Sequence, residues 1–504
     1  MKKNSLSRIL YIGSLLLSLS ACDKELTTAP TTAVPESLLY NTTDNIETVL
    51  NGTWSYMSDT YFTYANPGYS SILRTSDAMG NDVAVLPSKY GYRDAYPFTE
   101  MIDNSKTRVN AFWTILYRVI NNCNNVISKV DAAEGAQQEK DRIKGQALAL
   151  RANSYLTLAT FYQFSYLKDP NAKAVPLYTE PTSPQTVGKP KATLKEIYDV
   201  ILSDLSQAET LLANYKRPAG AKYKINTDVV RGLLARAYLN TGRWAEAAEK
   251  AAAARAGYGY MTSNDYYSGF NDLNNAEWIW GHGQTTEQSV ASYSFHYLDV
   301  SSASSYYYSF MADPYFMTLF SAGDIRKQLF LWDGLPGREG YLRYQKFKFR
   351  SNQTADIVLM RSSEMTLIEA EGNARSNRLP QAVQKLNELR AARNAALLDI
   401  AGQSQQAIVD TILVERRKEL WGEGFALSDI LRTQSSVTRK AYVTGTSTPI
   451  AVSVTAPDGT VKQVEAKGHT SLRFPDKTPF SPNSPYYLFA IPQNELNNNP
   501  NLNN

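Results

Sequence analysis

The chain is poor in the residues that build metal sites and nucleophilic catalytic sites. Its 504 residues include three histidines, His282, His296 and His469, and two cysteines. The histidines lack the helical His-x-x-x-His spacing of a zinc site, and there is no cysteine cluster. The sequence also lacks the phosphate-binding pattern G-x-x-x-x-G-K and the nucleophile elbow G-x-S-x-G. We therefore predict no catalytic residue, no metal site and no cofactor.

The cysteine count also excludes a disulfide framework. Cys22 ends the N-terminal leader described below, and Cys123 lies in the helical pattern NNCNNVISKV with no second cysteine to pair with. A lone cysteine on a helix is most often a small buried apolar residue. A chain of this size without disulfides has to be held together by its core.

The sequence also has little excess charge of either sign. The net charge is +4, from 52 basic and 48 acidic residues, and 43% of the residues are hydrophobic. These values are ordinary for a folded soluble protein. They give no reason to expect a nucleic acid as a partner.

The first 22 residues have the features of a lipoprotein leader. Lys2, Lys3 and Arg8 precede a short apolar run, which ends in Leu19-Ser20-Ala21-Cys22. The run is too short to span a bilayer. It resembles a bacterial lipobox, which predicts a signal peptide at 1–21 and a lipid on Cys22. The alternative is an ordinary secreted protein with an incidental cysteine.

The residues after Cys22 predict a tether and a location. Asp23-Lys24-Glu25 is similar to the acidic export signal of surface lipoproteins, so we expect a lipid-anchored protein at the outer membrane, exposed on the cell surface. Residues 22–40 are rich in Thr, Pro and Ala, which is typical of an extended tether.

The stretch 227–254 predicts two antiparallel helices. Val230, Leu234 and Ala237 recur at helical spacing, Asn240-Thr241-Gly242 is a turn signal, and alanines follow on one face. Leu234, Ala235, Tyr238 and Ala247 also match part of the tetratricopeptide pattern. One such pair cannot bury its own apolar face, so further pairs are expected.

Other segments extend this helical pattern. Residues 356–394 form a second pair-like unit, in which Ala370 and Ala382 take the spacing of Ala235 and Ala247. A hairpin is expected around Asp458-Gly459. Further helices are predicted at 44–57, 109–130, 143–162, 194–212 and 412–431.

Two long stretches without periodicity carry many aromatic residues. They span 61–98 and 257–350 in a chain with 33 tyrosines. Aromatic rings cover the apolar faces of sugars, while Asn, Asp and Arg side chains hydrogen-bond to sugar hydroxyls. These stretches are therefore candidates for a carbohydrate-binding surface. The alternative is that the rings pack the loops onto the helices.

Three carboxylates at four-residue steps, Glu415, Glu419 and Glu423, share one helix face. A glycosidase needs two carboxylates on either side of a bound sugar. Because Arg416, Arg417 and Lys418 lie between them in the sequence, ion pairing is the simpler interpretation.

Four segments carry recognisable motifs. They are KGQALALRANSYLTLATFYQFSY at 144–166 followed by AVPLYTEP, EIYDVILSDLSQAETLL at 196–212, ILVERRKELWGEGFALSDILRT at 412–433, and YYLFAIPQNELNNNPNLNN at 486–504. Together they resemble the SusD/RagB family of outer-membrane nutrient-binding lipoproteins. One departure is Gly424-Phe425-Ala426, where the family commonly has a His-Arg pair, so we assign no role of that pair to this chain.

The resemblance implies a mostly α fold, with about four tetratricopeptide-like helical pairs, long loop insertions and little β-structure. It implies a single domain at 41–504, with ligand-binding loops at about 61–98 and 278–332. It also implies a non-enzymatic role: capture of a glycan, or of a peptide, for a SusC-like TonB-dependent transporter.

The individual ligand-binding residues are predicted only from their position in these two loops. Trp278 and Trp280 have a second interpretation, because WIW alternates like a short buried strand. The candidates are Arg74, Asn81, Tyr90, Tyr92, Tyr96, Trp278, Trp280, Tyr306 and Trp332.

Two other classes of function compete with glycan capture. A surface glycoside hydrolase would release reducing ends, but the sequence has few histidines and no catalytic motif. A repeat scaffold that binds only proteins would not need the aromatic loops. The sequence does not identify the ligand.

Overall fold

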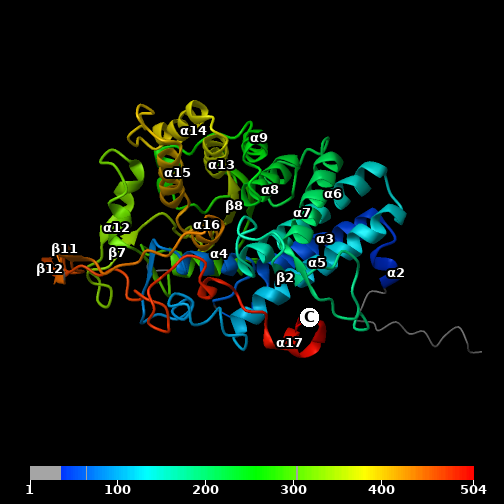
Figure 1. Cartoon of the computed structure of the whole chain (residues 1–504), viewed down its shortest axis with the longest axis horizontal. Coiled ribbons are helices and arrows are strands. Elements are labelled where there is room, and N and C mark those ends of the chain that lie inside the picture. The colour runs from blue at the N-terminus through cyan, green and yellow to red at the C-terminus, as the bar shows by residue number, and fades with distance from the viewer. Residues whose placement is uncertain (1–35, 64, 302–304, 446, 504) are drawn as a thin grey trace, which may run out of the picture.

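The computed structural model describes residues 36–63, 65–301, 305–445 and 447–503 (Figure 1). The expected signal peptide, the lipidation at Cys22 and most of the expected tether lie outside the described residues. The last part of that tether segment forms α2 (Glu36–Leu39). No helix in the described ranges has the length and the apolar run that crossing a membrane would require.

The scaffold is mostly α-helical and consists of four stacked helical pairs (Figure 1). Successive pairs are in contact through α5 with α6, α7 with α8, and α9 with α13, and α15 (Gln405–Leu420) packs against α13. The fold class predicted from the sequence is confirmed. The pairs are α3 (Thr43–Asp59) with α5 (Thr107–Lys129), α6 (Gln137–Phe161) with α7 (Leu194–Leu211), α8 (Thr227–Asn240) with α9 (Trp244–Ala254), and α13 (Ser362–Arg375) with α14 (Leu379–Ala392).

The α8–α9 pair forms as the sequence predicts. The Asn226 side chain caps α8 by accepting a hydrogen bond from the Val229 amide at 3.2 Å. Gly242 ends the turn at a φ of +76°, a conformation that favours glycine. The alanine face of α9 is buried, and a Cβ on Gly372 of α13 would lie 2.4 Å from the Trp244 carbonyl oxygen. Small residues therefore allow α9 and α13 to approach closely.

Two expectations about helices are wrong. Residues 412–431 are not one helix, because α15 ends at Leu420 and α16 (Ala426–Arg432) starts anew. Gly422 and Gly424 between them have φ values of +78° and +96°, which end the helix. The 61–98 stretch is also less irregular than expected, because it contains α4 (Ser70–Ala78). Eight of the nine residues of α4 are buried, and most of these are polar, so their burial does not follow the apolar pattern from which a helix face is predicted.

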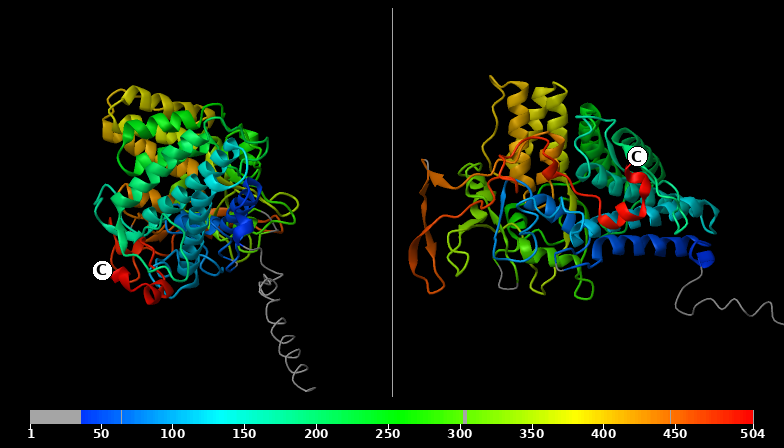
Figure 2. Two further views of the ribbon diagram at one scale, coloured as in Figure 1. Left: turned by 90° about the vertical axis from the view of Figure 1, so that its right-hand side faces the viewer. Right: turned by 60° about the horizontal axis from the view of Figure 1, so that its bottom comes forward.

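Small sheets connect the long loops. The main sheet has the strand order β1-β5-β7-β6 and pairs Val83 with Ala312, which joins the 61–98 stretch to the 257–350 stretch. The expected hairpin around Asp458-Gly459 is present as β11 and β12 and projects from the body (Figure 2). The strands are β1 (Val83–Val85), β2 (Lys173–Pro176), β3 (Lys191–Thr193), β4 (Trp278–His282), β5 (Phe310–Ala312), β6 (Phe330–Trp332), β7 (Leu342–Tyr344), β8 (Ile357–Arg361), β9 (Val443–Thr444), β10 (Thr448–Pro449), β11 (Ala451–Thr455) and β12 (Val461–Glu465).

Short helices complete the connections. They are α10 (Ser263–Tyr267), α11 (Phe295–Leu298), α12 (Pro314–Met317) and α17 (Gln493–Asn498), with 3-10 turns η1 (Val130–Ala132), η2 (Ala291–Ser294), η3 (Ile325–Leu329), η4 (Pro485–Tyr487) and η5 (Pro500–Asn503).

A network of buried ion pairs fixes the 257–350 stretch to the helical scaffold. Glu419 of α15 accepts hydrogen bonds from Arg326 at 2.8 Å, Arg361 at 2.7 Å and Arg393 at 2.8 Å. These four side chains are fully buried. Burial acts to raise the pKa of Glu419, but the three arginines outweigh it and hold the pKa well below its usual value. The network comprises the carboxylates of Glu277, Asp324, Glu415, Glu419 and Glu423 and the cations of Arg326, Lys346, Arg361, Arg393 and Lys418.

We predict that Glu419→Gln lowers the free energy of unfolding by about 3–5 kcal/mol, because it leaves buried arginines without their shared counter-ion. The matched control is Glu249→Gln, at an exposed position of α9, which should change it by less than about 0.5 kcal/mol. Chemical denaturation of the two variants measures both values. Equal stability of the two variants would contradict the importance of the network.

We also predict that stability falls as the pH is lowered from about 5 towards about 2. Burial acts to raise the pKa of Glu415, but Arg326, Lys418 and Arg390 outweigh it and hold the pKa at about 2. A carboxylate whose pKa is lower in the folded chain stabilises it above the unfolded-state pKa, and this stabilisation is lost as the pH falls to the folded-state value. Denaturation midpoints across this range measure the loss, which should be smaller in Glu415→Gln. A pH-independent midpoint would refute the prediction.

Candidate ligand-binding site

Five tyrosines from the two aromatic loop stretches meet on one surface. We call Tyr61, Tyr90, Tyr293, Tyr306 and Tyr307 the tyrosine platform. Their ring centroids are 5.8 Å apart for Tyr61 and Tyr293, 6.1 Å for Tyr90 and Tyr307, and 6.2 Å for Tyr293 and Tyr307. Tyr61, Tyr90 and Tyr306 are 43%, 48% and 59% exposed. The platform therefore presents aromatic surface to solvent without being a loose group of side chains.

Tyr306 is held by stacking on a histidine. Its ring centroid lies 4.1 Å from that of His296 in α11, with an interplanar angle of 16°. The His296 backbone carbonyl accepts hydrogen bonds from the amides of Tyr307 and Tyr308 at 3.2 Å and 2.7 Å. The short helix α11 thus positions the 305–308 segment, and His296 serves in packing.

A second layer of rings supports the platform from below. Tyr297 stacks under Tyr307 with centroids 4.9 Å apart and an interplanar angle of 7°. Tyr92 meets Tyr297 edge-on at 4.9 Å. Arg108 of α5 lies over the Tyr92 ring at 4.3 Å and donates to the Gly91 carbonyl at 2.7 Å. Burial raises the pKa of Tyr92 to about 12, so its hydroxyl stays protonated and donates to the Ala65 carbonyl at 3.0 Å.

Polar groups lie beside the rings. Lys89 donates to the Tyr308 hydroxyl at 2.8 Å, and Arg338 lies over the Tyr308 ring at 4.1 Å. Arg338 is also paired with Asp333 at 2.8 Å. Apolar ring faces next to charged and hydroxyl donors are the combination that a sugar requires.

The structure separates the nine predicted residues by exposure. Tyr90 and Tyr306 belong to the platform. Trp278 and Trp280 are buried in β4, which pairs with β8, so the alternative interpretation of WIW as a buried strand is confirmed. The Trp280 indole donates to the Tyr223 carbonyl at 3.2 Å.

Four more of the nine residues make contacts within the protein. Arg74 is buried and pairs with Asp77 at 3.8 Å, and Tyr92 lies in the second layer. The hydroxyl of buried Tyr96 lies 2.8 Å from His469 Nδ1. The Asn81 side chain accepts from the Thr438 amide at 2.8 Å. In this conformation the buried side chains Arg74, Tyr92 and Tyr96 are covered by protein atoms and do not face a ligand.

Trp332 lies in a separate aromatic group. Its ring is 6.1 Å from that of Tyr442, which meets Tyr315 edge-on at 4.9 Å. Trp332 is half-buried, and Leu331 beside it is 49% exposed. Within the described residues, the ring contact of Trp332 with Tyr442 does not connect it with the platform.

Three platform residues, Tyr61, Tyr293 and Tyr307, are not among the nine predicted ligand-binding residues. They lie in the predicted loops, but no period in those loops tells which rings face solvent. The one local feature of the sequence that could have pointed to Tyr307 is the run of three tyrosines at 306–308. In the structure Tyr306 is exposed, while Tyr307 and Tyr308 are half-buried.

The three carboxylates considered above as hydrolase candidates are engaged in ion pairs. Glu415, Glu419 and Glu423 are at most 5% exposed and bind the arginines and lysines of the buried network, so the ion-pairing interpretation is confirmed. Within the described ranges, no group of three or more His, Cys, Asp or Glu side chains could hold a metal ion.

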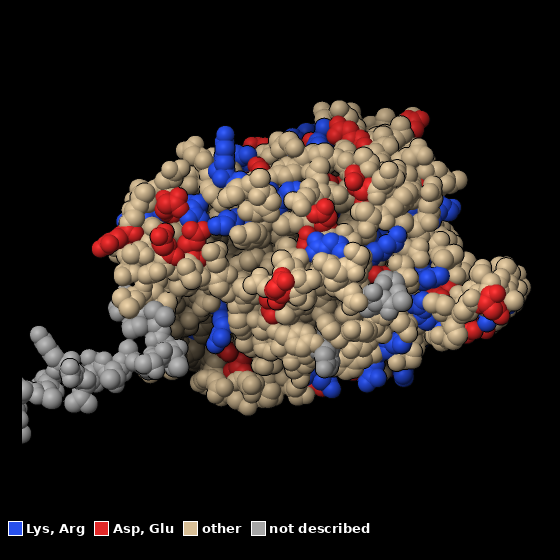
Figure 3. All heavy atoms as spheres, turned by 180° about the vertical axis from the view of Figure 1, so that it is seen from behind, with Lys and Arg blue, Asp and Glu red and all other residues tan. Residues whose placement is uncertain are grey.

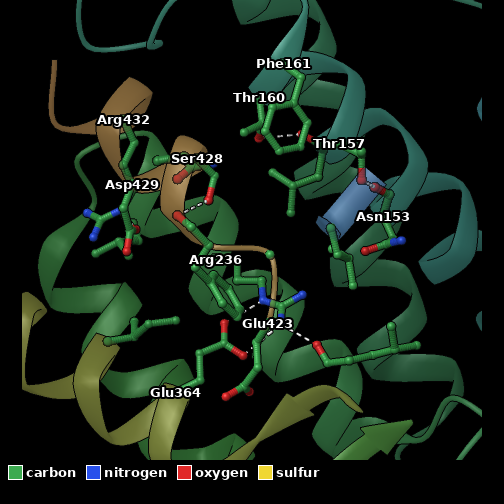
Figure 4. Close-up of a pocket in the computed structure, with 18 of the residues that line it drawn as sticks. Asn153, Thr157, Thr160, Phe161, Arg236, Glu364, Glu423, Ser428, Asp429 and Arg432 are labelled. Atoms are coloured by element: carbon green, nitrogen blue, oxygen red, sulfur yellow. Dashed lines mark hydrogen bonds and ion pairs between the residues drawn. The ribbon is translucent and has the colours of Figure 1, made fainter. Parts of the chain in front are cut away.

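A charged pocket in the scaffold is too small for a sugar ring (Figure 4). Its volume is about 100 Å³, and it lies between α6, α8, α13 and α16. Arg236 points across it to Glu364 at 2.7 Å, while Arg432 pairs with Asp429 at 2.6 Å. A cavity of about 150 Å³ holds one benzene molecule, so a pyranose ring does not fit here without rearrangement.

Comparison with known proteins gives consistent matches. A family model described as SusD-like, starch-binding and associating with the outer membrane matches residues 38–239, and the SusD family model matches residues 334–504. No curated protein matches the chain.

Solved structures match over most of the chain. A SusD-like carbohydrate binding protein from Bacteroides vulgatus is 46% identical, with 92% of this chain and 98% of that chain covered and a TM-score of 0.85. SusD superfamily proteins from Bacteroides thetaiotaomicron (23% identity, 92% and 99% covered, TM-score 0.71) and Bacteroides fragilis (20% identity, 92% and 100% covered, TM-score 0.72) share the fold.

We predict that Gly91→Ala disturbs the platform. Gly91 has a φ of +109°, and a Cβ there would lie 2.3 Å from Cε1 of Tyr297, the ring that supports Tyr307. The matched control is Gly257→Ala, which has a φ of +86° but no atom within 4 Å of the added Cβ. Gly91→Ala should be the less stable variant by about 1–3 kcal/mol and should change the tyrosine signal in near-ultraviolet circular dichroism. Identical stability and spectra of the two variants would contradict the packing described here.

Proposed function

Because the chain belongs to the SusD/RagB family, we propose that it captures glycans on the tyrosine platform and delivers them to a SusC-like TonB-dependent transporter in the outer membrane. The observation that carries the proposal is the platform itself. Residues from two distant loops place partly exposed rings side by side over a stacked second layer.

The chemistry of the platform suits a neutral oligosaccharide. Tyrosine rings offer apolar faces for the C–H groups of a sugar, and their hydroxyls exchange hydrogen bonds with its rim. Support from Tyr92 and Tyr297 fixes the rings before binding, which lowers the entropic cost of ordering them. Lys89 supplies an additional donor close to Tyr308, while buried Arg338 lies over the Tyr308 ring.

The distribution of charge is consistent with a neutral ligand. On the face seen in Figure 3, basic and acidic side chains are interspersed and separated by broad uncharged areas. That face presents no large patch of one sign of the kind that attracts nucleic acid. Glu415 and Glu419 of α15 and Glu423 in the turn after it are used in ion pairs, which favours binding over hydrolysis.

The delivery step rests on the leader and on the family. A lipid on Cys22 would keep the protein at the outer membrane, next to the transporter that receives the glycan. The related protein from Bacteroides vulgatus is described as carbohydrate binding, which supports a saccharide as the ligand class here.

The test is a calorimetric titration of the chain from Asp23 onward with plant, microbial and host oligosaccharides and with peptides. We predict binding of at least one glycan, weakened about tenfold by Tyr306→Ala or Tyr90→Ala, which corresponds to about 1.4 kcal/mol. The matched control is Tyr223→Ala, at a 36% exposed tyrosine outside the platform, which should bind as the unmodified chain does.

Three results would contradict the proposal. Binding of peptides alone would assign the platform to peptide capture. Release of reducing ends from a glycan would indicate a hydrolase. Unchanged affinity in the two platform variants would place the ligand elsewhere.

A further inference from the structure

A second concave surface lies between α5 and the C-terminal end of the chain. This cleft has a volume of about 760 Å³ and is lined by residues of α3, α5, the 178–188 loop and α17, none of which belongs to the tyrosine platform. Its volume is within the range of about 300–1,000 Å³ that is typical of small-molecule sites.

One stripe of α5 holds the walls of the cleft together. Trp113, Tyr117 and Asn121 are spaced at four-residue steps and bind three different partners. The Trp113 indole donates to Glu495 Oε2 at 3.3 Å, and the Tyr117 hydroxyl donates to the Pro176 carbonyl at 2.7 Å. Asn121 both accepts from the Thr182 amide at 2.7 Å and donates to its carbonyl at 3.3 Å. The cleft is therefore built before any ligand arrives.

The C-terminal segment closes the other side. The Asn499 side chain donates to the Lys189 carbonyl at 2.9 Å, and that of Asn501 donates to the Gly188 carbonyl at 2.7 Å. These bonds fix the end of the chain to the 178–188 loop, so the mouth of the cleft has a defined width.

The neighbouring stripe of α5 lines the same cleft but makes no polar side-chain bond to the described part of the chain. The side chains of Thr114, Arg118 and Asn122, again at four-residue steps, make no hydrogen bond or ion pair with the described part of the chain. Arg118 lies over the ring of Tyr56 from α3, 5.2 Å from its centroid. A hydroxyl, a guanidinium and an amide thus line an open cleft with half-buried aromatic rings around it, and Arg118 is exposed to solvent.

We infer that this cleft is a second saccharide-binding site, in which Tyr56, Tyr117 and Tyr178 cover sugar faces and Thr114, Arg118 and Asn122 hydrogen-bond to sugar hydroxyls. Arg118 and Glu495 are the charged residues of its lining, one of each sign, so the cleft favours a neutral ligand over an ion. Its mixture of tyrosines, amides and hydroxyls matches a sugar better than it matches a purely apolar ligand.

The cleft and the platform adjoin the same end of α3. Tyr56 lies in the last turn of this helix, and Tyr61 follows two residues after its end. Five residues span at most about 18 Å even when fully extended. A longer glycan that occupies both sites binds more tightly than a short one, because the second contact becomes intramolecular. The inference goes beyond capture on the platform and does not depend on it.

The test compares maltotriose with a longer maltooligosaccharide, and the same two lengths from xylan and β-glucan, by calorimetry. The variants are Asn122→Ala and Arg118→Ala in the cleft and Tyr306→Ala in the platform, with Asn171→Ala, at an exposed loop position, as the matched control. Because the Asn122 side chain has no described partner, Asn122→Ala should unfold at the same temperature as the unmodified chain.

We expect the Tyr306→Ala variant to bind the short sugar weakly at one site, the cleft. The double variant Tyr306→Ala with Asn122→Ala should not bind it. Each cleft variant alone should weaken the longer chain about tenfold. Loss of binding in the cleft variants with no effect of Tyr306→Ala would support the cleft while refuting the platform. Cleft variants that bind both lengths as the unmodified chain does would overturn the inference, as would a chain that binds none of these sugars.

Discussion

The fold depends on the buried ion pairs around Glu419. Placing charges in the protein interior is unfavourable unless each finds its counter-ion with good geometry, so such a network strongly constrains the segments that contribute to it. Here Arg326 comes from the 257–350 stretch, Arg361 from β8, and Arg393 from the end of α14. A loop segment without helical periodicity is in this way tied to the repeat scaffold at fixed points.

A chain of packed rings connects this network with the ligand-binding surface. Lys346 pairs with Glu423 in the network, and Phe347 next to it meets Phe295 edge-on at 5.6 Å. Phe349 in turn lies 4.8 Å from His296, the ring on which Tyr306 stacks. The orientation of the exposed tyrosine is thus set by contacts that begin at buried charges. This arrangement explains how long insertions can present a preformed aromatic surface.

The sequence predicted the helical pairs because their apolar residues recur with the helical period and glycine marks the turn, as in α8 and α9. It did not predict α4, which is buried on nearly every side, nor the break after Leu420. At Gly424-Phe425-Ala426, where the chain lacks the His-Arg pair common in the family, the packing requires a small residue. A Cβ on Gly424 would lie 2.6 Å from that of Leu73, so α4 packs where a larger residue would not fit. For the ligand-binding surface, the sequence predicted the two loop stretches but not which of their aromatic rings are exposed. That exposure depends on the β1–β5 pairing and on ring stacking between distant segments.

The central claim is that sugar rings bind to preformed tyrosines at the junction of two loop stretches. The most direct measurement is a crystal structure of the chain with a bound oligosaccharide. The account predicts sugar rings against Tyr90 and Tyr306, with Tyr297 still stacked beneath Tyr307 as in the free protein. An oligosaccharide bound only at Trp332 and Tyr442, or a platform whose rings have separated, would contradict it.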